Sequence, residues 1–211
     1  MLRASPHTVG FACVLLAAGA SGMLPAERSR PRAIDAALWF DPVTYASPRL
    51  GGPLAAGDLR RIEATARSEI LQAFAGLRFS LADRPGATYQ VRVAQDVRDE
   101  RFRRDVGVAG QSRAAPGLGG YGAVSFSFLA SGAMVYAPED APREELVEAI
   151  GRGIGRTAVH EFTHQLLPKV AIDASTDIQS FEYRSAARHE QYFGTMRWDV
   201  AWPLLQAWAD R

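Results

Sequence analysis

The sequence predicts an α+β domain, in which a small mixed β-sheet packs against helices. Apolar residues recur every three or four positions in two stretches, at 58–74 and 140–167, and this spacing gives a helix one apolar face. Apolar and polar residues alternate at 89–93 and 123–128, as they do in strands with one buried face. The chain has 211 residues, a length typical of one domain.

The first residues have the pattern of a secretory signal peptide. Arg3 is the only charged residue before Glu27, and the apolar run at 9–20 is too short to span a bilayer comfortably. This run ends in Ala18-Gly19-Ala20, which fits an A-x-A cleavage site. We therefore expect a signal peptide at 1–20 and a secreted or periplasmic mature protein.

After the signal peptide we expect a disordered leader at 21–32 and a single domain at 33–211. Cys13, the only cysteine, would leave with the signal peptide, so the mature protein would have no disulfide. Without Arg3 the mature protein has 23 Lys and Arg residues against 23 Asp and Glu residues, which leaves no net field to attract nucleic acid or an anionic membrane. We expect neither a nucleic-acid partner nor stable membrane insertion after cleavage. The near-absence of Lys indicates a GC-rich bacterial genome.

Several short strands are predicted around the two helices. They lie at 34–45, 77–81, 89–93, 123–128 and 133–136. The last two would form a hairpin around Ser131-Gly132, and the Gly-rich stretch at 106–122 predicts a mobile loop before it. The exposed edge of this hairpin could pair with an extended peptide, while an ordinary core hairpin explains the same side chains equally well.

The C-terminal part predicts two further helices. Ser175-Thr176-Asp177 has the composition of a helix cap, followed by a helix at 178–190 that Gly194 ends. Near the C-terminus, Pro203 suits a helical first turn within a stretch rich in Trp. Trp at this density is more typical of core closure than of a ligand site.

The chemistry-bearing motif is His160-Glu161-Phe162-Thr163-His164, late in the second predicted helix. Residues four apart lie on one helix face, so His160 and His164 can hold one metal ion. Glu161 stands beside them, where it can take a proton from a metal-bound water. A structural site usually fills all four metal positions with Cys or His, and the chain offers no other nearby Cys. The motif therefore predicts a hydrolytic metal site.

This order of elements, with H-E-x-x-H on the second helix, resembles the zincin metallopeptidases. The pentapeptide carries the resemblance. The metzincin extension is absent, since the chain has Leu167 and Val170 where that pattern needs Gly and His. The gluzincin pattern places a Glu ligand on a following helix, and Glu182 lies at a similar interval after His164. The resemblance implies a zincin-like fold with an edge strand beside the metal helix, a Zn²⁺ cofactor, and a peptide or protein substrate.

The third metal ligand is open among several downstream residues, which are Asp173, Asp177, Glu182, His189 and Glu190. The gluzincin pattern favours Glu182, and on the predicted helix His189 would share its face two turns later, near the substrate. His189 is the alternative ligand, and a solvated Glu182 is the ordinary interpretation. Gluzincins often carry a carboxylate four residues after the ligand Glu. Ala186 stands there, which leaves Asp173 or Asp177 to orient a histidine.

The sequence thus predicts a zinc-dependent peptidase. The resemblance implies that zinc activates a water molecule and that Glu161 accepts its proton and delivers it to the leaving amine. Candidates for stabilising the oxyanion are His189, Tyr183 and Tyr192. The alternative is a zincin-fold envelope or protein-interaction module with little or no proteolysis, against which the intact motif argues.

Overall fold

The computed structural model describes residues 31–98, 107–115, 119–167 and 172–211. The expected signal peptide and most of the expected leader lie outside these residues. In the described part of the chain, none of the helices is long and apolar enough to cross a membrane.

The core of the fold is a five-stranded mixed sheet in the order β4-β1-β5-β7-β6. Its strands are β1 (Ile34–Phe40), β4 (Phe79–Ala82), β5 (Tyr89–Ala94), β6 (Gly110–Ala115) and β7 (Gly119–Ser125). The first four strands in spatial order are parallel, and β6 pairs antiparallel with β7 at one edge. A separate small pair joins β2 (Ala46–Ser47) to β3 (Gly52–Pro53). The mixed sheet agrees with the predicted α+β class.

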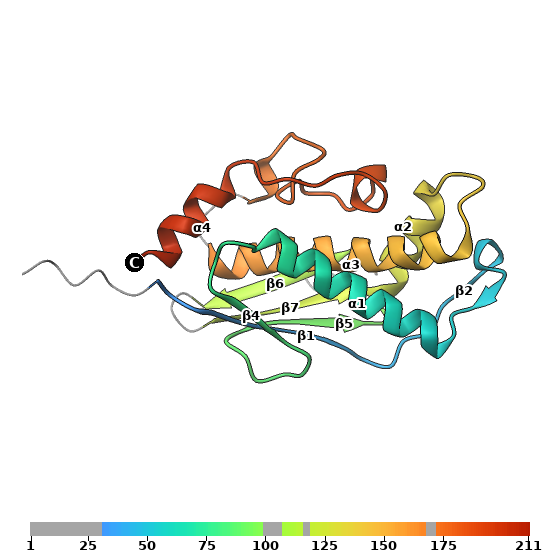
Figure 1. Ribbon diagram of the computed structural model, residues 1–211, viewed down its shortest axis with the longest axis horizontal. Coiled ribbons are helices and arrows are strands. Elements are labelled where there is room, and N and C mark those ends of the chain that lie inside the picture. The colour runs from blue at the N-terminus through green and yellow to red at the C-terminus, as the bar shows by residue number, and fades with distance from the viewer. Residues whose placement is uncertain (1–30, 99–106, 116–118, 168–171) are drawn as a thin grey trace, which may run out of the picture.

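Two long helices pack side by side on one face of the sheet (Figure 1). They are α1 (Ala56–Ala73) and α3 (Arg143–Leu166). The apolar stripes that predicted them are buried, as at Ile62 and Ile70 on α1 and Ile154 and Phe162 on α3. The segment after residue 171 covers the other side of α3, which therefore lies between the sheet and the C-terminal part (Figure 1).

The predicted hairpin at 123–136 is wrong. Strand β7 ends at Ser125, and α2 (Phe126–Tyr136) follows at once. The Ser125 hydroxyl accepts a hydrogen bond from the Phe128 backbone N–H, so this serine caps the helix. The apparent alternation of Ser with apolar residues came from the cap and the first turn of a helix, whose later apolar residues are buried at helical spacing.

The stretch at 106–122, expected as a mobile loop, contains β6 and most of β7. Its glycines allow close packing against α3. A Cβ added at Gly120 would lie 2.4 Å from Gln165 of α3, and one at Gly110 would lie 2.5 Å from Glu161 Oε1. Glycine therefore allows α3 to approach the sheet edge closely, next to the H-E-x-x-H turn.

The helix predicted at 178–190 is also wrong. The chain makes turns there, with short 3-10 helices η2 (Ile172–Ala174) before it and η3 (His189–Gln191) at its end. The side chains of Asp177 and Ser180 accept hydrogen bonds from backbone N–H groups two residues further on. Such local bonds compete with helical ones, so residues read as a helix cap instead begin a series of turns.

The C-terminal helix forms as α4 (Ala201–Ala209). Trp198 before it donates from Nε1 to the Ala73 carbonyl at 2.9 Å and packs on Phe74 with 5.6 Å between ring centroids. Trp202 and Trp208 are partly buried against the same core. The expectation that the tryptophans close the core is confirmed.

Gly155 of α3 should be intolerant of a side chain. A Cβ there would lie 2.6 Å from the Ala66 carbonyl oxygen of α1, which is backbone and cannot swing aside. Alanine favours a helix by about 1 kcal/mol over glycine, yet we expect Gly155→Ala to lower the free energy of unfolding by about 2 kcal/mol because overpacking outweighs that gain. Urea denaturation measures this, with Gly57→Ala in α1 as the control, since its Cβ would meet nothing closer than 3.9 Å.

Candidate metal centre

The last turns of α3 bring His160 and His164 together, and Asp173 joins them. The two Nε2 atoms are 3.1 Å apart. The 3-10 helix η2 places Asp173 Oδ1 3.2 Å from His160 Nε2 and 3.7 Å from His164 Nε2. Among the described residues, these three side chains form the group that can hold a metal ion.

The spacing of the three atoms fits a tetrahedral metal. Zinc binds imidazole nitrogen and carboxylate oxygen at about 2.0–2.2 Å, which places neighbouring ligand atoms about 3.3 Å apart. The three observed separations lie on either side of that value. When both Nε2 atoms are unprotonated, the two imidazole nitrogens and the carboxylate oxygen present lone pairs to one point, and a cation between them relieves their repulsion.

The orientation of His160 supports the same conclusion. Its Nδ1 lies 2.8 Å from the Phe181 carbonyl oxygen. Because a carbonyl only accepts, Nδ1 carries the proton and the lone pair of Nε2 faces the group, as in metal-binding histidines generally. The side chains of His160 and His164 are 13% and 30% exposed, and that of Asp173 is 53% exposed. The group is therefore open on the aspartate side, where a further ligand can enter.

The electrostatics of the group favour bound positive charge. Contact with His160 and His164 holds the pKa of the Asp173 carboxyl well below its usual range. Burial by itself would lower the pKa of His160, but Asp173, Glu161 and the Phe181 carbonyl more than offset this and raise it. The surroundings of His160 therefore favour a cation beside it, whether a proton or a metal.

Glu161 lies beside the group and faces the sheet edge. Its side chain is buried, and Oε1 lies next to Gly110 of β6. Burial raises the pKa of its carboxyl, partly offset by the two histidines. Ser112 of β6 donates to the Glu161 carbonyl at 3.1 Å, which fixes the edge strand against this turn.

Gln165 anchors the same turn to the inner sheet. Its Oε1 accepts from the Gln90 backbone N–H, and its Nε2 donates to the Gln90 carbonyl, both at 3.1 Å. This pair of bonds joins the end of α3 to β5. The end of α3 is thus held to the sheet by hydrogen bonds between side chains and the main chain.

The structure does not bring Glu182 to the histidines, and Asp173 lies there instead. The Glu182 carboxylate is fully buried and accepts hydrogen bonds from the Ser180 hydroxyl and from the backbone N–H groups of Asp199, at 2.8 Å, and Ala201. These N–H groups belong to the start of α4, where a helix lacks internal partners and favours a negative charge. Glu182 therefore secures the segment whose Phe181 carbonyl orients His160.

Removing the Glu182 carboxylate should destabilise the fold. Glu182→Ala leaves two backbone N–H groups at the start of α4 without their partner, and we expect the free energy of unfolding to fall by about 3 kcal/mol. Chemical denaturation measures the change. Glu139→Ala, at an exposed position, is the control and should change stability by less than about 0.5 kcal/mol. An equal effect of both variants would contradict this role of Glu182.

The structure also does not bring His189 or Tyr192 into the histidine group. His189 is exposed in η3, with its ring 5.6 Å from that of Phe193. Tyr192 is fully buried between α2 and α3 and stacks on Tyr136 with 5.8 Å between centroids. Tyr183 is the remaining candidate for stabilising the oxyanion. The Arg188 guanidinium carbon lies over its ring, 4.8 Å from the ring centroid.

Sequence reasoning considered Asp173 only as one candidate among several, and it did not find the Phe181 carbonyl. A backbone carbonyl has no signature in the sequence. Asp173 does have one signal, since it is the first carboxylate after the motif. No known protein family matches the chain, and no match is found among curated proteins or among solved structures. A function for this chain therefore has to be argued from its own residues.

Proposed function

We propose that the protein is a zinc-dependent peptidase with its metal held by His160, His164 and Asp173. The observation that carries this proposal is the triangle of two imidazole nitrogens and one carboxylate oxygen, with separations of 3.1, 3.2 and 3.7 Å. Catalytic zinc sites use three protein ligands of this kind and keep one position open, whereas structural sites are closed by four Cys or His ligands. The Asp173 side chain is exposed, which fits a catalytic site that keeps one coordination position open.

The residues of the chain then have separate roles. Bound zinc supplies a Lewis acid that polarises a carbonyl and activates water. The Phe181 carbonyl keeps the His160 proton on Nδ1. Glu161 accepts a proton at its carboxylate and returns it to the leaving amine, and burial suits it to this role because a raised pKa makes the carboxylate a better base near neutral pH.

The sheet edge supports a peptide as the substrate. In the described part of the chain β6 pairs with β7 alone, so its outer side offers main-chain donors and acceptors to an extended chain. This edge lies directly against the Glu161 turn. Together with the order of elements, it supports a zincin-like fold. The signal-peptide pattern at 1–20 supports action in the periplasm or outside the cell.

Metal analysis of the purified mature protein, combined with cleavage of a peptide library, tests the proposal. We expect about one zinc per chain, cleavage that a chelator stops, and recovery on adding zinc. Absence of a bound metal after zinc loading would contradict the proposal. Zinc binding without any cleavage would instead favour the interaction module.

A further inference from the structure

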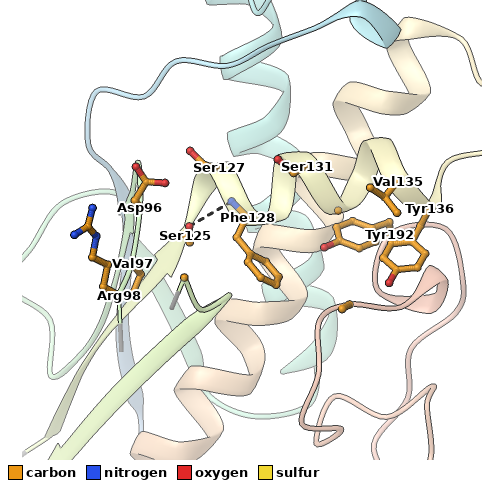
Figure 2. Close-up of a pocket in the computed structure, with 13 residues that line it drawn as sticks. Asp96, Val97, Arg98, Ser125, Ser127, Phe128, Ser131, Val135, Tyr136 and Tyr192 are labelled. Atoms are coloured by element: carbon orange, nitrogen blue, oxygen red, sulfur yellow. Dashed lines mark hydrogen bonds between the residues drawn. The ribbon is translucent and has the colours of Figure 1, made fainter. Parts of the chain in front are cut away.

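A pocket of about 640 Å³ lies upstream of the metal centre, between the end of β7, α2 and the C-terminal segment (Figure 2). This volume is in the range of ligand-binding pockets and exceeds what one aromatic side chain needs. Most of its wall comes from α2 and the residues before it, and Tyr192 closes it from the side of α3.

The wall combines aromatic rings with one unsatisfied hydroxyl. Phe128, Val135, Tyr136 and Tyr192 supply apolar surface, and Val135 is 73% exposed although apolar. The Tyr192 hydroxyl is buried and has no hydrogen-bond partner, which is rare for a buried polar atom. Figure 2 shows it turned toward the side of the pocket where Phe128 lies.

The hydroxyls of Ser125 and Ser127 on the same wall already have partners. The Ser125 hydroxyl accepts from the Phe128 N–H, and the Ser127 hydroxyl accepts from Gln95 Nε2 at 2.7 Å. Of the buried side-chain atoms without a partner in the described residues, Tyr192 Oη is the one that belongs to this pocket. A ligand with a polar atom at the end of an aromatic group would satisfy it.

The distance from this pocket to the metal centre follows from the geometry of α3 and, independently, from that of the sheet edge. Along α3, the Tyr192 ring lies against Gly153, and from there to Glu161 the helix rises about 12 Å. Along the sheet edge, Gly107 lines the pocket and Gly110 lies against Glu161, a span of at most about 10 Å. Both equal about three residues of an extended peptide.

We propose that this pocket binds an aromatic side chain bearing a polar atom, tyrosine or tryptophan, about three residues from the bond cleaved at the metal centre. The position relative to a cleaved bond rests on the proposed function, whereas recognition of the side chain does not. The apolar wall holds the ring, and the Tyr192 hydroxyl pairs with the substrate hydroxyl or indole N–H. The proposal deepens the peptidase assignment by naming a specificity-determining residue.

Position-resolved cleavage of a peptide library by the zinc-loaded protein tests the wall. We expect Tyr and Trp to be favoured about tenfold over Ala at one position two to four residues from the cut. Val135→Glu places a charge on the wall at an exposed site and should abolish that preference. Leu71→Glu on α1, also an exposed apolar residue and outside the pocket, is the control and should leave the profile unchanged.

Tyr192→Phe tests the hydroxyl separately, because the ring keeps its place against Tyr136. We expect Tyr and Trp to lose an advantage of about threefold over Phe, while all three stay favoured over Ala through the ring contacts. A purely structural tyrosine would leave the profile unchanged, and that result would overturn the role given to the hydroxyl. Thermal melting confirms that the variant is folded.

A binding measurement separates failure of this inference from failure of the proposed function. If the protein cleaves nothing, calorimetric titration with matched peptides that carry Tyr or Ala still applies. A preference for the Tyr peptide that Val135→Glu removes supports the pocket, even though the peptidase assignment has failed. Equal binding of both peptides overturns the inference.

Discussion

Replacing Glu161 by Gln should remove most hydrolytic activity while leaving the metal content unchanged. Glu161 lies one residue from His160, but it is not part of the ligand triangle, and its Oε1 lies next to Gly110 of β6. Gln keeps the shape and loses the proton acceptor. Since general acid–base groups contribute about 10²- to 10⁴-fold, we expect kcat on a cleaved peptide to fall within that range, with zinc content measured by mass spectrometry.

Folding of this variant should not be impaired. Burial raises the pKa of the Glu161 carboxyl, so the ionised form is disfavoured in the folded protein, and a neutral amide removes that cost. Glu144→Gln, on the same helix but at an exposed position, is the matched control and should retain full activity. Loss of zinc together with activity in Glu161→Gln would show that Glu161 is a ligand and that its role as a base is mistaken.

The helices that position the site could be read from the sequence because their apolar spacing is long and regular. Over α1 and α3 the periodic residues are the buried ones, and the strands at β1 and β5 lie within or close to their predicted ranges. The same reasoning failed at 123–136 and 178–190, where the pattern is short. There a single hydroxyl or carboxylate bonded to the backbone decides the structure, and periodicity does not report such bonds.

The motif itself was fully visible in the sequence, whereas the third ligand was not. The case for Glu182 depended on a helix at 178–190, and that helix does not form. With turns in its place, Glu182 points to the start of α4, while Asp173 of η2 lies at the histidines. Spacing along the chain does not report which carboxylate reaches the histidines, because turns carry no periodic pattern.

Replacing Asp173 should therefore weaken metal binding more than any change at Glu182. Its Oδ1 completes the triangle with both histidines, and two imidazoles alone leave a hydrolytic zinc short of one protein ligand. Groups that only orient a ligand already contribute about 10- to 100-fold to metal affinity, so we expect Asp173→Ala to raise the dissociation constant for zinc by more than about 100-fold. Competition with a chromogenic chelator measures it.

The fold should tolerate this change, which makes the result decisive. The Asp173 side chain is 53% exposed, so its loss leaves no buried partner unsatisfied beyond the two histidines. Asp83→Ala is the matched control, because this exposed aspartate lies outside the histidine group and should leave zinc affinity within about threefold. Glu182→Ala should lose zinc only in proportion to the fraction of protein that unfolds. If Glu182→Ala loses zinc while fully folded and Asp173→Ala retains it, the ligand set is His160, His164 and Glu182, and the segment from 172 to 200 must rearrange when zinc binds.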